Sequence, residues 1–265
     1  MNWRQKKRSH PCGNLLLTRQ RFRRWHKTPL GKFLADEEFQ QLDSVLCNLF
    51  GYHLIQVGKA GWGNCFGSTR VPHCLIIDQD YEQTEGLAPE SGSRVGGVPD
   101  ALPIASDAVD VVTLPHVLEF VRRPHQVLRE VDRILIPEGH VVILGYNPFS
   151  FWLIARLLLG WRRQPPSCGR FYSVTRIKDW LSLLGFDMVY TGYFFYRPPI
   201  QHMGIISRLA FMERLGARLW PIFGGGYVIV AKKRVVTLTP IKPRWRPRRS
   251  FIPAGAVETQ NRNKT

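Results

Sequence analysis

Glycines and an acid follow the first two predicted strands, where they could hold a ligand that carries a ribose. The glycines come directly after the predicted strand 53–57: Gly58, Gly61 and Gly63. Asp78 ends the next predicted strand, about twenty residues further on, which is the usual place for an acid that binds sugar hydroxyls. Glycine lets the backbone approach such a ligand closely. A tight strand–helix turn that merely needs glycine explains the same pattern.

Four further side chains are placed for substrate chemistry. His116 follows the predicted strand 109–114 and could remove a proton from a substrate nucleophile. The alternative is a structural histidine that closes the pocket. Tyr146 and Asn147 lie just past the predicted strand 140–144 and Trp152 follows them, so all three face the same mouth and are candidates for substrate contact.

Helices and strands must alternate to position these residues. Apolar residues recur at helical spacing over three segments: 36–50, 124–135 and 173–184. Short apolar runs predict strands at 53–57, 74–77, 109–114, 140–144, 186–196 and 227–232. This alternation indicates an α/β fold with a doubly wound, mostly parallel sheet. Ligands of such sheets bind outside the carboxyl ends of the strands, at the point where the strand order reverses.

One block of sequence carries a family signature. The block consists of a Leu-Pro turn, the predicted strand 109–114, a His-Val-Leu-Glu segment and a helix followed by Pro and Gly. The residues that match the signature are Leu102, Pro103, Asp110, His116, Val117, Leu118, Glu119, Pro124, Leu128, Glu130, Arg133, Leu135, Pro137 and Gly139. The block resembles the class I S-adenosylmethionine-dependent methyltransferases of the ubiquinone/menaquinone and biotin-pathway type. The resemblance runs roughly over residues 53–234.

The resemblance implies a Rossmann-like sheet of about seven strands and S-adenosylmethionine as cofactor. It assigns cofactor contacts to Gln56, Gly58, Gly61, Gly63, Asp78, Asp100, Ala101, Leu102 and Pro115. Gln56 and the glycines then line the methionine end, Asp78 binds the ribose, and residues 100–102 border the adenine. The sequence departs from the family at Gln56, where an acid is usual. It also spreads the glycines by about one residue and places Trp62 among them.

Three functions are compatible with these residues. The first is methyl transfer to an apolar or small-molecule acceptor, with His116 as the candidate catalytic residue. The second is a catalytically silent, methyltransferase-like binding or regulatory protein, which the departures in the glycine motif favour. The third is an RNA-binding methyltransferase, which rests on the net charge of +17.

The amino-acid composition limits the possible binding partners and the cellular compartment of the protein. The excess of 37 Lys+Arg over 20 Asp+Glu gathers at the two ends of the chain. Such ends favour nucleic acid or anionic lipid headgroups, although they also serve as solvated tails. An Arg-rich start also resembles a transit peptide. Five cysteines without a C-x-x-C pair argue against disulfides or a zinc site and favour a cytoplasmic location. No apolar run approaches membrane-spanning length.

These observations divide the chain into three parts. Residues 1–28 are expected to form a loosely attached basic arm, residues 29–234 the methyltransferase-like domain, and residues 235–265 a disordered Pro-rich tail. Within the domain, residues 146–170 are rich in apolar and aromatic side chains and predict a lid or substrate insertion. Its arginines would suit peripheral contact with a membrane or a lipid-like acceptor. A helix packed on the domain's own core is the alternative.

Overall fold

The computed structural model describes residues 22, 24–58, 66–67, 69–79, 93–150, 152, 169–198, 208 and 211–234, except for the side chains of 214 and 217. The chain divides into two compact units, 1–235 and 236–265. All described residues belong to the first unit, so the predicted tail lies outside them.

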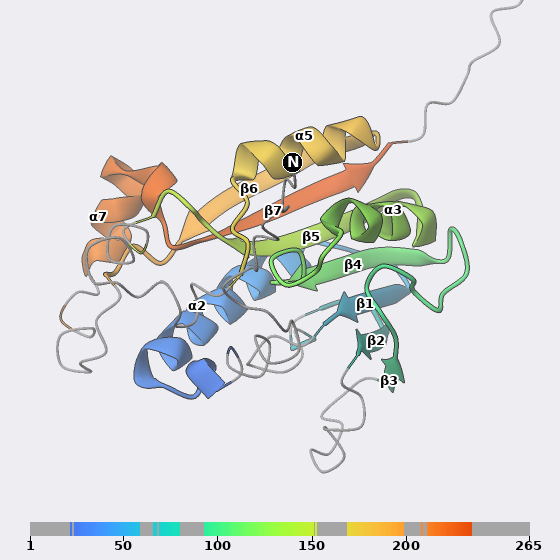
Figure 1. Ribbon diagram of the computed structural model, residues 1–265, viewed down its shortest axis with the longest axis horizontal. Coiled ribbons are helices and arrows are strands. Elements are labelled where there is room, and N and C mark those ends of the chain that lie inside the picture. The colour runs from blue at the N-terminus through green and yellow to red at the C-terminus, as the bar shows by residue number, and fades with distance from the viewer. Residues whose placement is uncertain are drawn as a thin grey trace, which may run out of the picture. The chain divides into compact units, whose positions relative to one another are not determined.

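Seven strands form one sheet in the order β3-β2-β1-β4-β5-β7-β6 (Figure 1). Their bounds are β1 His53–Val57, β2 His73–Asp78, β3 Ser93–Gly96, β4 Val109–Pro115, β5 Leu135–Tyr146, β6 Phe186–Phe194 and β7 Gly226–Lys233. The first five strands run parallel, and β7 is antiparallel to both of its neighbours. The strand order reverses between β1 and β4, which confirms the predicted doubly wound α/β fold and locates its ligand-binding edge.

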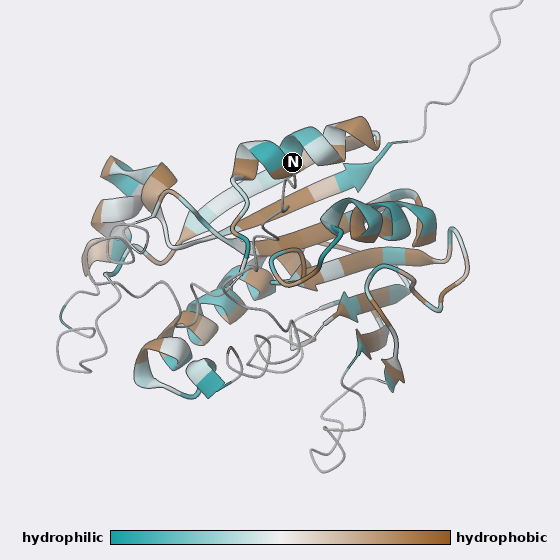
Figure 2. Cartoon of the chain, viewed as in Figure 1, coloured by the Kyte–Doolittle hydropathy of each residue, from teal (hydrophilic) through white to brown (hydrophobic). Residues whose placement is uncertain are grey.

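Helices cover both faces of the sheet (Figure 1). Helix α3 (Pro124–Ile134) and helix α5 (Val174–Leu183) pack on one face, where Val127, Val131 and Ile177 join a buried apolar cluster. Helix α2 (Pro29–Leu46) packs on the other face through a second cluster. The central strands β4 and β5 are predominantly hydrophobic (Figure 2), as expected of strands buried on both faces.

The ends of these helices follow the capping chemistry of the sequence. The hydroxyl of Ser173 accepts a hydrogen bond from the backbone N–H of Arg176 and starts α5. Gly185 ends it with a φ of 83°, a left-handed conformation that glycine adopts without strain. The helix thus occupies the segment 173–184 that the apolar spacing predicts. Thr28 caps α2 and Pro29 takes its first position, so this helix begins before the predicted start at Asp36 and ends at Leu46.

The predicted N-terminal arm is wrong for the part of it that the structure describes. Phe22 and Trp25 are 4% and 7% exposed and belong to the apolar cluster beneath α2. His26 is buried beside them. Because these side chains are part of the core, the folded region includes Phe22, well before residue 29. Residues 1–21 lie outside the described chain.

Three further elements were not predicted. β3 is a short, largely exposed edge strand with no apolar alternation. Helix α7 (Phe211–Leu219) and the 3₁₀ turn η2 (Pro221–Phe223) precede β7. β5 also starts five residues early, at Leu135, and continues through Pro137 and Gly139, which were expected to separate helix from strand.

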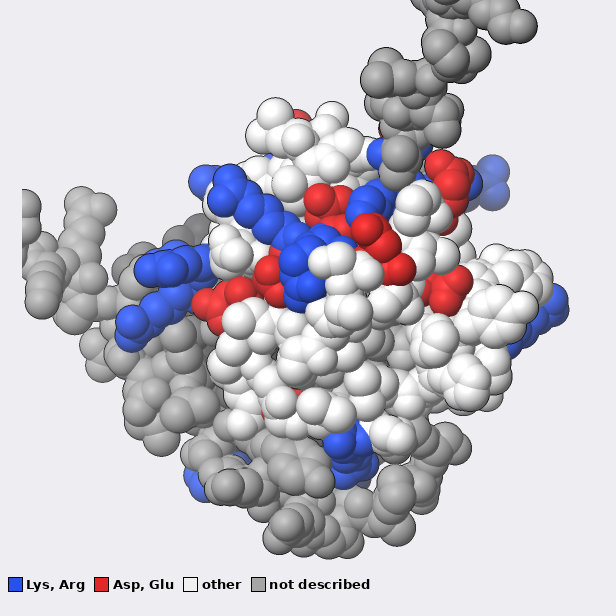
Figure 3. All heavy atoms as spheres, turned by 90° about the vertical axis from the view of Figure 1, so that its right-hand side faces the viewer, with Lys and Arg blue, Asp and Glu red and all other residues white. Residues whose placement is uncertain are grey.

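The face at the amino ends of the parallel strands carries intermingled acids and bases (Figure 3). Lys232 pairs with Glu138, Lys233 with Asp107 at 3.1 Å, and Arg234 with Asp187 at 2.6 Å. Exposed pairs of this kind contribute little to stability. The pairs do neutralise Lys232, Lys233 and Arg234 locally. These residues therefore do not form a basic surface, although the net charge of the chain is +17.

Candidate functional site

The carboxyl ends of β1 and β2 bring together Gly58 and Asp78, as predicted. Gly58 adopts a φ of 77°, and its N–H donates to the carbonyl of Ile77 at 2.7 Å. This bond fixes the first turn after β1 directly beside the end of β2. The Asp78 side chain is 9% exposed. Gly61 and Gly63 lie outside the described residues.

Gln56 lies on β1 and is fully buried. Its side-chain amide donates to the carbonyl of Gly58 at 3.0 Å. The glutamine therefore supports the turn after β1. An aspartate at this position would set a buried negative charge against that carbonyl, which suggests why the amide suits this chain better than the family's acid.

The predicted adenine-side residues form a small turn. Ala101 donates its N–H to the carbonyl of Val98 at 3.1 Å, and both Asp100 and Ala101 are exposed. Leu102 is buried, and its N–H donates to Glu130 at 3.1 Å. That N–H is therefore engaged within the protein, and it fixes the turn that is predicted to border the adenine.

Two residues of the family signature hold this turn from helix α3. Arg133 donates to the carbonyls of Leu102 at 3.1 Å and Ile104 at 2.9 Å, and it forms an ion pair with Glu130 at 2.9 Å. Glu130 in turn accepts the N–H of Leu102. The Leu-Arg-Glu-x-x-Arg pattern thus clamps the loop after β3 with a charge-assisted network.

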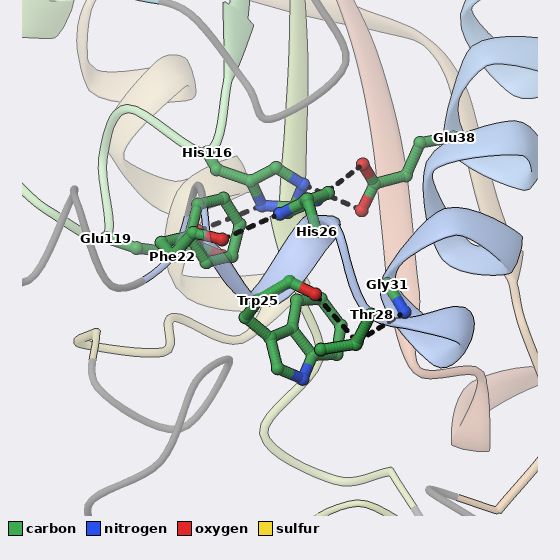
Figure 4. A network of polar contacts seen from close by, with 8 residues as sticks. All are labelled: Phe22, Trp25, His26, Thr28, Gly31, Glu38, His116 and Glu119. Atoms are coloured by element: carbon green, nitrogen blue, oxygen red, sulfur yellow. Dashed lines mark hydrogen bonds and ion pairs between the residues drawn. The ribbon is translucent and has the colours of Figure 1, made fainter. Parts of the chain in front are cut away.

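A buried charge network lies beyond the end of β4 (Figure 4). His116 is 2% exposed, and its Nε2 lies 2.9 Å from a carboxylate oxygen of Glu38 on α2. Its Nδ1 lies 3.0 Å from Glu119. His26 approaches the other Glu38 oxygen at 3.8 Å. The network connects the end of β4 to α2 and to the N-terminal segment.

Opposite charges determine the protonation of this network. The carboxylates of Glu38 and Glu119 raise the pKa of His116 to about 10, overcoming the burial that lowers it. His116 and His26 lower the pKa of Glu38 to about 2, against the burial that raises it. His116 is therefore an imidazolium that donates from both ring nitrogens.

Among the described residues, no group of His, Cys, Asp and Glu has a geometry that could hold a metal ion.

The geometry of the network favours the structural alternative for His116 over the candidate catalytic base. A protonated imidazole with both nitrogens engaged has no lone pair to accept a proton. The backbone of His116 has a φ of 54°, which is unusual for a residue other than glycine, and its backbone N–H donates to the carbonyl of Leu144. Pro115, predicted to border the cofactor, is buried directly before it. His116 acts as a structural cation, the alternative that the sequence left open.

The three predicted substrate residues pack inside the protein. Tyr146 is 2% exposed and stacks on His116 with ring centroids 4.2 Å apart. The side chain of Asn147 donates to the carbonyls of Ile222 and Gly224, and its own carbonyl oxygen accepts the N–H of Phe149. The Asn147 side chain therefore links η2 to the segment after β5.

Trp152 belongs to an aromatic cluster at the ends of β4 and β5. Its ring centroid lies 5.8 Å from that of Trp25 and 6.5 Å from that of Tyr146. Its indole N–H donates to the carbonyl of Arg197 at 3.2 Å. Trp152 thus packs against the core. Residues 151 and 153–168, the bulk of the predicted lid, lie outside the described chain.

Comparison with known proteins places this arrangement in a family. The methyltransferase domain model matches residues 49–143, which run from before β1 into β5. The uncharacterized protein YafS of Escherichia coli (strain K12) is 32% identical over 220 residues, covering 82% of this chain and 84% of YafS. The chain belongs to the class I S-adenosylmethionine-dependent methyltransferases. The signature residues on α3 and after β4 are thus family residues of a methyltransferase.

Solved structures agree with the methyltransferase fold. A methyltransferase of Thermotoga maritima, described as a possible histamine N-methyltransferase, superimposes with a TM-score of 0.59 at 17% identity, over 82% of this chain and all of that one. A chain from the complex of the Haloferax volcanii Trm112 methyltransferase activator gives 0.58 at 14% identity, over 83% and 99%. At these low sequence identities, the structural similarity shows only that the folds are alike.

Sequence reasoning missed Glu38 of this methyltransferase, the residue that binds His116 from α2. A signal was present. Leu30, Leu34, Leu42 and Leu46 recur every four residues with Glu38 in the middle of the same stripe. A single acid on an otherwise apolar helix face indicates a buried charge with a partner.

The network makes stability depend on pH in a defined direction. Folded His116 keeps its proton up to about pH 10, whereas the unfolded chain releases it near pH 6.5. Its contribution to stability is therefore fully present below pH 6.5 and is lost as the pH rises towards 10. The melting temperature should fall over this window, by more than it does in a His116→Gln variant. Parallel curves for the two proteins, followed by scanning fluorimetry, would contradict the assignment.

Proposed function

We propose that this methyltransferase binds S-adenosylmethionine across the carboxyl ends of β1, β2 and β3 and transfers its methyl group to an apolar or small-molecule acceptor. The observation that carries the proposal is that the hydrogen bond from Gly58 to Ile77 sets the turn after β1 beside the end of β2, where Asp78 lies. A glycine in the left-handed region gives a ligand access to the backbone, and a carboxylate at the next strand end suits two ribose hydroxyls. The residues present therefore fit the cofactor.

The chain's own residues position the reactants. Asp78 would accept hydrogen bonds from the ribose, and the clamp of Glu130 and Arg133 would hold the adenine-side turn still. When bound, the cofactor supplies an electrophilic methyl group. Transfer is an in-line displacement, for which alignment can suffice without a base. That fits a site whose histidine is held as a cation.

The aromatic cluster supports an apolar acceptor. Phe22, Trp25, Tyr146 and Trp152 surround the ends of β4 and β5, beside the proposed cofactor edge. Phe22, Trp25 and Tyr146 are themselves only 2–7% exposed, so their support for the proposal is that the protein beside this edge is apolar, which favours an apolar acceptor. The charged groups beneath them are engaged with one another, so they leave the cluster's apolar character unchanged.

One observation favours a second candidate, a cofactor-binding protein without transferase activity. The side-chain amide of Gln56 is turned to Gly58 where the family has an acid, so the methionine end lacks that negative charge. Measured turnover separates the two candidates, because both require the cofactor to bind.

Asp78→Ala should weaken binding of S-adenosylhomocysteine by about 1–3 kcal/mol, roughly five- to 150-fold, because two charge-assisted hydrogen bonds are lost. Isothermal titration measures this directly. Asp187→Ala is the matched control, since Asp187 lies on β6 and pairs with Arg234. If millimolar cofactor changes neither the melting temperature nor the heat of titration of the wild-type protein, the proposed function fails.

A further inference from the structure

An exposed apolar surface lies on α7 and η2, at the end of the molecule opposite the amino ends of the parallel strands (Figures 1 and 2). We call it the α7 surface. Its side chains are between 41% and 59% exposed: Phe211, Leu215, Leu219, Trp220, Ile222 and Phe223. Large apolar side chains gathered in this way on a soluble surface commonly mark an interaction site.

The orientation of α7 is fixed by its inner side. Glu213 forms an ion pair with Arg197 at 3.1 Å and accepts the N–H of Tyr196 at 3.1 Å. Gly216 is buried so closely that an added Cβ would lie 2.4 Å from the ring of Tyr196. The helix therefore packs through Glu213 and Gly216. Its apolar residues at positions 211, 215 and 219, spaced by four, necessarily share the outer side.

The α7 surface reaches the exit of β5. Asn147 follows β5 and donates to the carbonyls of Ile222 and Gly224, which holds η2 against this exit. The hydroxyl of Tyr196 also donates to Pro221 at 2.9 Å. Phe149, two residues past Asn147, is 58% exposed. The exposed apolar side chains thus extend from α7 to the edge where the aromatic cluster lies.

Charge indicates what the α7 surface binds. Arg208 and Arg218 are exposed on this segment, whereas its acid, Glu213, is turned inward and paired. The described residues of the segment 208–223 therefore present arginine, aromatic and leucine side chains together. This is the composition of a helix that lies in a membrane interface, with rings and leucines at the acyl boundary and arginines at the headgroups.

We propose that the α7 surface docks this protein on anionic lipid bilayers as a peripheral membrane contact. Within the described chain, no helix is long and apolar enough to cross a membrane, so the contact is with one leaflet. The net charge of +17 strengthens attraction to anionic headgroups. The docking goes beyond methyl transfer and does not depend on it. If the proposed function also holds, docking would set the acceptor edge beside the lipid.

The test is cosedimentation of the full chain with vesicles of phosphatidylcholine alone or mixed with phosphatidylglycerol. The wild-type protein should bind the mixed vesicles far more tightly, and added salt should weaken that binding. Leu215→Ser combined with Leu219→Ser should reduce binding about tenfold or more, because both leucine side chains no longer enter the interface. Arg218→Gln should reduce the salt dependence.

Leu183→Ser is the matched control, because Leu183 is 85% exposed on α5, away from the α7 surface. It should leave vesicle binding unchanged. Since the substituted leucines are exposed, all variants should melt close to the wild-type temperature and bind S-adenosylhomocysteine equally well. That titration keeps a failure of docking distinct from a failure of the proposed function.

Three outcomes would overturn the proposal. One is wild-type protein that does not sediment with phosphatidylglycerol vesicles. Another is equal binding by the double variant and the wild type. The third is a concentration-dependent dimer in light scattering that the double variant abolishes without any vesicle binding, which would assign the α7 surface to a second copy of the chain.

Discussion

His116→Leu is expected to lower the free energy of unfolding by about 3–5 kcal/mol, measured by urea denaturation, because it leaves buried carboxylates without their cation. Glu38 and Glu119 each lie about 3 Å from the imidazole, and both are buried. Leucine supplies apolar volume but neither charge nor hydrogen bonds. The two acids would then face each other across the gap or take up protons.

A second substitution separates lost charge from lost packing. Glu38→Gln in the His116→Leu background removes one stranded carboxylate, so the double variant should recover part of the lost stability. His125→Leu is the matched control, because His125 is exposed at the start of α3. It should change stability by less than about 0.5 kcal/mol. A His116→Leu effect as small as this control would contradict a buried ionic network.

Phe22→Ala should cost about 3–5 kcal/mol, since it removes a ring at the centre of the aromatic cluster. The Phe22 ring lies 4.3 Å from that of His26, 5.0 Å from Phe120 and 5.5 Å from His116, centroid to centroid. Alanine leaves a cavity beneath the buried charges. A chain shortened to begin at residue 28 loses Trp25 as well, so its melting temperature should fall by well over ten degrees.

If residues 1–28 were instead the loosely attached arm expected from the sequence, the shortened chain would melt within a few degrees of the full one, and that result would contradict the structure. Tyr52→Ala controls for loss of an aromatic ring as such, because Tyr52 is 71% exposed. It should leave the melting temperature nearly unchanged. Near-ultraviolet circular dichroism of the Phe22→Ala variant would report whether the cluster loses its fixed packing.

Much of the sheet could be predicted because its strands are buried on both faces. β1, β2 and β4 are rich in apolar residues, and each begins and ends within one residue of its predicted limits. α3 and α5 carry clear helical periodicity and, for α5, a serine cap. These are local signals that tertiary packing reinforces.

The remaining elements lack such local signals. β3 reads Ser-Arg-Val-Gly and gains its strand geometry only by pairing with β2 at the edge of the sheet. Phe22 and Trp25 have helical spacing, but arginines surround them, and composition there favoured a tail. Their burial depends on a pocket formed by residues nearly a hundred positions away, such as Phe120.

The residues of the candidate site also differ in whether the sequence could predict their roles. Gly58 and Asp78 could be placed because strand ends of a parallel sheet share one edge. The roles of His116 and Asn147 could not, since each depends on a partner distant in sequence: Glu38 on α2 for the histidine and the η2 backbone for the asparagine. A residue type at a strand end indicates proximity to the site, whereas its partners decide what it does there.

β7 gives the chain an unusual order of assembly. This strand lies between β5 and β6, although both precede it in the sequence. Until residues 226–233 leave the ribosome, β5 keeps an open edge and β6 has no neighbour among the described strands. A nascent chain of that length offers unpaired, apolar strand edges to other chains. We therefore expect the second half of this sheet to form only after synthesis has passed residue 233, which makes late-stalled chains clients for chaperones.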